Sequence, residues 1–203
     1  ILGAKPLNVA QKPREFFRGQ MSNVRISRSV RYTSDFAPLS RFESDADTLA
    51  LYHCDEGQGD VLKDSSGNNH HGKIVGAKWV TSDGKPASPP NNYALEFDGK
   101  FSHVQLPGPS WKESSPLTVE AFVRSYRNPE HYQPMQILCD AESAGIALEV
   151  TQKIRFMAFD KEKYQTVDAN ASLVKDELYH VAGIFDGKQV QLYVNGRLQR
   201  ETA

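Results

Sequence analysis

The chain has 203 residues, with 24 basic and 25 acidic side chains and a formal net charge of −1. This balance gives no bulk electrostatic reason to expect a nucleic-acid or other polyanion partner, and no apolar run approaches the roughly 18 residues of a membrane span. A chain of this length buries about 70% of its unfolded surface, which suits one large all-β domain or two small ones.

Strand and turn signals recur along the chain, and helical periodicity is almost absent. Apolar and polar residues alternate with a period of two, and polar stretches rich in Gly and Pro separate these segments, as is typical of a β-sandwich or barrel. We expect a connector at 33–47 and loops at 56–72, 81–92 and 128–134. Strands are expected at 16–27, 48–55, a short segment ending at Trp79-Val80, 93–97, 101–106, 117–127, 136–139, 146–150 and 154–159.

The stretch 178–198 has the clearest pattern, with two alternating segments around Asp186-Gly187-Lys188. A Gly at this point accepts a positive φ at little steric cost, which predicts a tight hairpin turn. A second turn signal, Asn195-Gly196, follows at once. Since a lone hairpin is marginal in water, a larger sheet must surround it, and about a dozen mostly antiparallel strands predict two packed sheets.

The two cysteines, Cys54 and Cys139, lie in strand-like segments and do not form a disulfide framework. We interpret them as free, buried thiols, because Cys packs as a small hydrophobe. The alternative is a single bridge across the sandwich.

Four segments in this order resemble the laminin-G-like (concanavalin A-like) jelly-roll family. They are ALYHCDEGQGDVLKDSSGNNHHGKIVGAKWV at 50–80, YALEFDGKFSHVQLP at 93–107, LTVEAFVR at 117–124 and YHVAGIFDGKQVQLYVNGRL at 179–198. The resemblance implies an antiparallel two-sheet jelly-roll sandwich. The style of residues 25–80 is similar to bacterial surface or signalling proteins with appended modules of this kind, such as those of planctomycetes.

The first forty residues resemble the same family but lie out of place. Members usually continue the hairpin with a segment like IGA…FFxGxIDEVRIS, and here Ile1–Ala4 and FFRGQMSNVRIS at 16–27 stand at the front. One hypothesis is that residues 1–42 complete the domain begun in 43–203, as in a circular permutant, so that 20–27 pairs with 48–55 in a monomer. The other is that residues 1–42 complete a neighbouring molecule in a strand-swapped dimer.

A calcium site is a candidate at the loop Asp64-Ser65-Ser66-Gly67-Asn68. Ca²⁺ takes about six to eight oxygen ligands, which a polar Gly-containing loop can supply, and relatives often bind calcium on this rim. The expected ligands are Asp64, Asn68 and Asn23, although relatives usually offer an acidic residue where this chain has Ser22-Asn23. The alternative is an Asx-turn in which Asp64 caps its own loop.

Aromatic residues in or beside loops are candidates for ligand binding, because exposed rings stack on sugar faces and anchor interfaces. The alternative is that Trp111 plugs the open end of the sandwich and Tyr164 pairs across strands. The candidate ligand-binding residues are Trp111, Tyr126, His131, Tyr132 and Tyr164.

Catalysis is not expected. The family includes glucanases, which need two carboxylates about 5–9.5 Å apart. The nearest pair in the sequence, in Glu96-Phe97-Asp98, uses Asp98 as a turn residue. No Gly-x-Ser-x-Gly motif occurs either.

The expected function is therefore a non-catalytic binding or adhesion module for a carbohydrate or protein ligand. The chain opens on Ile1 and no signal peptide is visible, so we expect a piece of a longer protein. The family resemblance implies that this longer protein is exported or lies on the bacterial cell surface. The alternatives are a structural spacer or assembly domain and, less favoured, a degenerate glycoside hydrolase. The fold alone does not establish any of these three functions.

Overall fold

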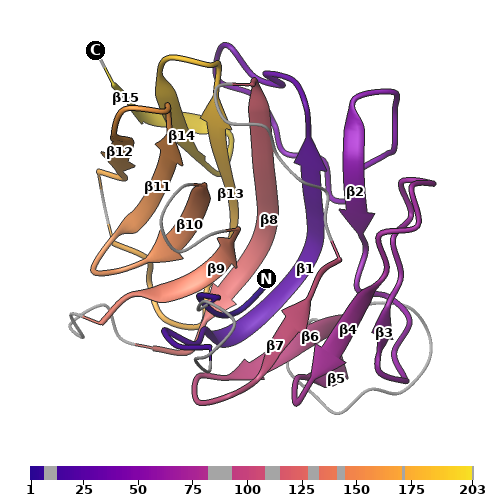
Figure 1. Cartoon of the computed structure of the whole chain (residues 1–203). Helices are drawn as coiled ribbons and strands as arrows, with labels where there is room; N and C mark the ends of the chain where they lie inside the picture. The colour runs from indigo at the N-terminus through magenta and orange to yellow at the C-terminus, as the bar shows by residue number, and fades with distance from the viewer. Residues whose placement is uncertain are drawn as a thin grey trace.

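The computed structural model describes residues 1–6, 13–81, 93–107, 115–127, 133–140, 145–170 and 172–202. This part of the chain is an antiparallel β-sandwich of two packed layers (Figure 1), which confirms the expected fold class. The described residues form no helix, and so none that could cross a bilayer.

The strands are named in chain order. They are β1 (Arg18–Ser27), β2 (Thr48–Tyr52), β3 (Val61–Leu62), β4 (Gly72–Val75), β5 (Lys78–Thr81), β6 (Tyr93–Asp98), β7 (His103–Gln105), β8 (Leu117–Ser125), β9 (Met135–Cys139), β10 (Ile146–Val150), β11 (Ile154–Phe159), β12 (Tyr164–Asp168), β13 (Leu178–Phe185), β14 (Val190–Val194) and β15 (Arg197–Glu201).

Strand β1 lies in the middle of the larger sheet, whose order is β15-β14-β13-β8-β1-β6-β5 with β2 also paired to β1. It pairs antiparallel with β8 along most of its length and with β6 at its start. The expected pairing of 20–27 with 48–55 is present, since β1 meets β2 from Val24↔Tyr52 to Ser27↔Thr48. Completion of the domain by permutation stays a prediction, as does the strand-swapped dimer, and the mass from light scattering separates the two.

The first residues of the chain join the two parts of the second sheet. One part is β12-β11-β10-β9 and the other is β3-β4-β7. Leu2 bridges both, because its backbone pairs with Val104 at 3.0 and 2.9 Å and forms a bridge with Leu138. The N-terminus accordingly lies in the middle of the molecule (Figure 1), and its ammonium donates to the Cys139 carbonyl at 2.8 Å.

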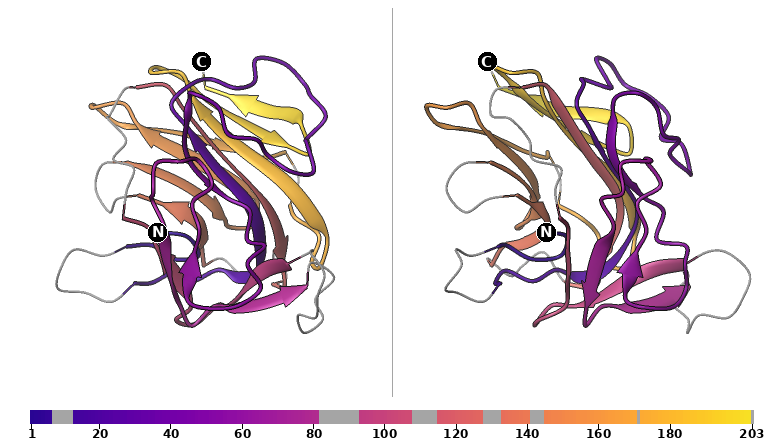
Figure 2. Two further views of the ribbon diagram at one scale, coloured as in Figure 1. Left: turned by 90° about the vertical axis from the view of Figure 1, so that its right-hand side faces the viewer. Right: turned by 45° about the vertical axis from the view of Figure 1, so that its right-hand side comes forward.

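Apolar residues that alternate along the strands fill the space between the two layers, which Figure 2 shows from two further sides. Phe17 and Phe97 meet edge to face there, with ring centroids 6.1 Å apart. Close packing also explains Gly183 in β13, where a Cβ would lie 2.3 Å from the ring of buried Phe156. A fully packed interior leaves the ends and outer faces of the sandwich as the places for function.

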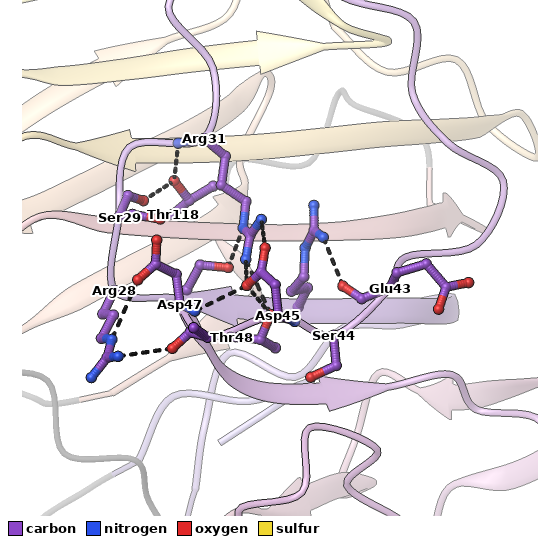
Figure 3. Close-up of polar contacts among 12 residues, drawn as sticks. Arg28, Ser29, Arg31, Glu43, Ser44, Asp45, Asp47, Thr48 and Thr118 are labelled. Atoms are coloured by element: carbon purple, nitrogen blue, oxygen red, sulfur yellow. Dashed lines mark hydrogen bonds and ion pairs between the residues drawn. The ribbon is translucent and has the colours of Figure 1, made fainter.

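Residues 28–46, which we call the strap, cross the outer face of the larger sheet between β1 and β2. Figure 2 shows the strap on the side away from the orange strands. Tyr32 and Phe36 stack at 3.5 Å between centroids and cover Tyr193 of β14. At its ends, Arg31 pairs with Asp45 at 2.7 and 2.9 Å (Figure 3). The strap residues and Tyr193 therefore form a second, small hydrophobic core on the outer face of this sheet.

The structure differs from the sequence-based expectation in several segments. The expected loop 56–72 contains the two-residue strand β3 and the first residue of β4. The expected strand 101–106 is shortened to β7. Strand β12 was not expected, because its residues YQTVD are mostly polar. The loops expected at 81–92 and 128–134 lie almost entirely outside the described residues. Both cysteines are buried thiols that are not bridged to each other, as predicted.

Candidate functional site

A hollow of about 750 Å³ opens at the end of the sandwich where β1 and β9 begin and β6 and β8 end. We call it the end pocket. The ends of these strands meet because β1 runs antiparallel to both of its neighbours, with Arg18 opposite Asp98 and Gly19 opposite Ser125. The pocket is lined by Phe16, Arg18, residues 96–101, Tyr126, Arg127, Gln133 and Met135.

The turn after β6 presents an aromatic ring to the end pocket. The Oδ1 atom of Asp98 accepts hydrogen bonds from the backbone N–H groups of Lys100, Phe101 and Ser102 at 2.9, 3.0 and 3.0 Å. These bonds hold the pKa of Asp98 below its ordinary value, although burial alone would raise it. Phe101 is 57% exposed at this fixed turn, so its ring is available without rearrangement.

Tyr126 is the one predicted ligand-binding residue that the structure places in the end pocket. Its backbone N–H donates to the Arg18 carbonyl at 3.0 Å, which fixes the chain beyond β8 against β1. Burial raises the pKa of Tyr126 to about 12, and the negative charge of the Glu96 carboxylate adds to the shift. The phenol is therefore neutral across the physiological range.

The other predicted aromatic residues do not join this site in the described structure. Tyr164 lies in β12 of the opposite sheet and pairs across strands with Phe159, at 5.3 Å between ring centroids. It borders a separate hollow of only about 90 Å³. Trp111, His131 and Tyr132 lie outside the described residues.

Asp64 is held by its own loop and by β2. Its Oδ1 accepts from the backbone N–H groups of Leu51 and Ser66, both at 2.9 Å, and its Oδ2 accepts from Ser66 Oγ at 2.8 Å and His70 N at 2.9 Å. Burial alone would raise the pKa of Asp64, but these four hydrogen bonds outweigh it and lower the pKa.

The residues proposed for calcium do not fit a calcium ion in this arrangement. Both carboxylate oxygens of Asp64 already face hydrogen-bond donors. The amide of Asn68 donates to the carbonyls of Thr48 and Leu49 at 3.1 and 3.0 Å. Asn23 contacts Ser40 and His53 instead, and the described residues hold no cluster of three or more His, Cys, Asp or Glu suited to a metal. Calcium binding stays a prediction, and the local geometry is that of an Asx-type cap.

A buried ionic cluster under the strap was not anticipated from the sequence. Glu120 of β8 is 1% exposed, and its Oε1 accepts from Arg25 Nε and Nη2 at 2.8 and 2.6 Å. Its Oε2 accepts from Tyr32 Oη and lies beside His180 Nε2, both at 2.9 Å. The available signal was a charged or polar residue inside each of three apolar strands: VRI, VEA and YHV. The strap shields this cluster from solvent, and the buried cluster thereby stabilises the fold.

The nearest carboxylate pair of the sequence, Glu96 and Asp98, does line the end pocket. A glycosidase needs a carboxylic acid with a raised pKa to protonate the leaving group. The pKa of Asp98 is lowered by its turn, so Asp98 does not meet this requirement.

Comparison with known proteins identifies the family of the chain. A family model described as the concanavalin A-like lectin/glucanases superfamily matches residues 98–203. This match covers just over half of the 203 residues, from the turn at Asp98 through β15. No curated protein and no solved structure matches significantly.

Proposed function

The chain belongs to the concanavalin A-like lectin/glucanase superfamily, and from that premise we propose that it is a non-catalytic module that binds a carbohydrate in the end pocket. The observation that supports this proposal is that the exposed ring of Phe101 and the phenol of Tyr126 line the same pocket. Aromatic rings at the wall of a polar hollow are typical of sites that stack on sugar faces.

The absence of catalysis is part of the proposal. The turn after β6 occupies Asp98 Oδ1 and lowers the pKa of this carboxyl, which disfavours Asp98 as a proton donor. We propose that the module belongs to a larger exported or cell-surface protein, where it attaches the parent protein to a glycan. A protein ligand or a purely structural spacer would be revealed by the same measurements.

Truncation of the pocket's rings tests the proposal. We expect Phe101→Ala and Tyr126→Ala each to weaken binding of an array-identified saccharide by about tenfold or more, because a stacked aromatic anchor contributes roughly 1–2 kcal/mol. Isothermal titration calorimetry measures the affinities. Tyr164→Ala is the matched control, because it removes a partly exposed tyrosine from the opposite sheet.

Equal affinities for all four proteins would place the ligand elsewhere. An array without any saccharide hit would favour the spacer function, and we would then abandon the end pocket as a lectin site.

A further inference from the structure

Three cations surround the end pocket without an ion pair among the residues that the structure describes: Arg18, Lys100 and Arg127. Most other arginines in the described chain do have carboxylate partners. Arg31 pairs with Asp45, and Arg155 with Asp168, each at 2.7 Å. The pocket therefore carries local positive charge, although the whole chain is almost neutral.

The two carboxylates of the end pocket, Glu96 and Asp98, offset only part of this charge, because they stand against three cations. Asp98 lies directly opposite Arg18 in the sheet, but its Oδ1 is taken up by the turn through three backbone N–H groups and the Ser102 hydroxyl. Within the described residues, neither carboxylate forms an ion pair with the three cations. An anionic ligand would consequently meet arginines that are still available.

Arg18 and Arg127 lie near enough to repel each other. The pKa of Arg127 is lowered, first by burial and then by the positive charge of Arg18. The described hydrogen bond of the Arg127 guanidinium goes to the Gln133 carbonyl at 3.3 Å. A carboxylate placed between the two guanidinium groups would relieve this repulsion and match their planar donor geometry.

Two of the strands that form the pocket wall lie inside the larger sheet. β6 lies between β1 and β5, although β5 pairs with it only as far as Glu96, and β8 lies between β1 and β13. Strand addition, a common way to bind a peptide, therefore has little free edge on these two strands. The exposed Phe101 ring beside the cations suits a cyclic ligand that offers a flat face and an acidic group together.

We propose that the end pocket binds an acidic saccharide, with Arg18 and Arg127 on the sugar's carboxylate and Phe101 and Tyr126 against its ring. This inference rests on the proposed function and specifies its ligand class. Lys100, on the exposed turn, adds charge at the rim.

The test compares trigalacturonate with its fully methyl-esterified form, which keeps the rings and loses the charges. Calorimetry on the whole chain is expected to show binding of the acid at least about tenfold tighter than the ester, because charge-assisted hydrogen bonds are lost with the ester. In the double variant Arg18→Gln/Arg127→Gln, this preference disappears. The control variant Arg197→Gln/Arg200→Gln removes the same charge from β15, away from the pocket, and retains the preference.

Four outcomes would overturn the inference. Equal binding of acid and ester, or equal loss of the preference in both double variants, would remove the specific role of the two arginines. Binding of hexaglutamate as tight as that of trigalacturonate would show that charge alone suffices. If neither galacturonate form binds while a neutral saccharide binds through Phe101 and Tyr126, the proposed function stands and the acidic preference is wrong.

Discussion

Replacing Glu120 with alanine is expected to lower the free energy of unfolding by about 3–5 kcal/mol, because it leaves a buried charge without its partner. Arg25 is 6% exposed, its guanidinium donates twice to Glu120, and its Cζ atom lies 4.6 Å from the centroid of the Phe42 ring. His180, which is 2% exposed, loses the same carboxylate. Chemical denaturation followed by tryptophan fluorescence or circular dichroism measures the loss.

The matched control for Glu120 is Glu162→Ala, which removes an exposed carboxylate from the turn before β12 and should change the stability by less than about 0.5 kcal/mol. A loss below about 1 kcal/mol for Glu120→Ala would contradict the proposed role of the cluster in holding the strap on the sheet.

The same cluster is expected to make the free energy of unfolding depend on pH. Burial alone would raise the pKa of Glu120, but the hydrogen bond from His180 and the charge of Arg25 outweigh it and lower the pKa. A carboxyl with a lowered folded-state pKa contributes stability above its unfolded pKa of about 4.3 and loses it as the pH falls through the folded value. The difference in stability between wild type and Glu120→Ala should therefore shrink below about pH 4.

The second large effect is expected at Asp64, where alanine should cost about 3 kcal/mol of unfolding free energy. Four donors lose their acceptor, and three of them are backbone N–H groups, those of Leu51, Ser66 and His70. Asp60→Ala, in the same polar region but exposed, is the control. A loss below about 1 kcal/mol would mean that the loop does not depend on its cap.

The same unfolding measurement on Asp64→Ala can be repeated in the presence of calcium. With the carboxylate occupied by donors, the cost of Asp64→Ala should be the same in excess calcium and in a chelator. A cost that grows in calcium, together with a heat of calcium binding that the variant lacks, would establish the metal site predicted from the sequence.

The local alternation of apolar and polar residues predicted most of the strands, and the resemblance of four segments predicted their arrangement. The hairpin of β13 and β14 was clear because its turn carries Gly187 at a positive φ, and Gly196, also at a positive φ, marks the next turn, between β14 and β15. Strand β3 was missed because two residues are too short to show a period.

The sites were harder to predict because they depend on register between distant strands. Arg25 and Glu120 are 95 positions apart and meet only because β1 lies beside β8. Tyr126 was expected from its place next to a loop. Phe101 was assigned to a strand, whereas the cap of Asp98 holds it in a turn and exposes its ring. No pattern within one segment could have placed Arg18 beside Arg127.

The most direct test of the end pocket as the binding site is a ¹⁵N–¹H NMR titration of the whole chain with trigalacturonate or with an array-identified saccharide. We predict that the largest shifts belong to the amides of Arg18, Lys100, Phe101, Tyr126 and Arg127. Shifts confined to the Asp64–His70 loop or to the outer face of β11 and β12, with the end pocket unperturbed, would contradict this account.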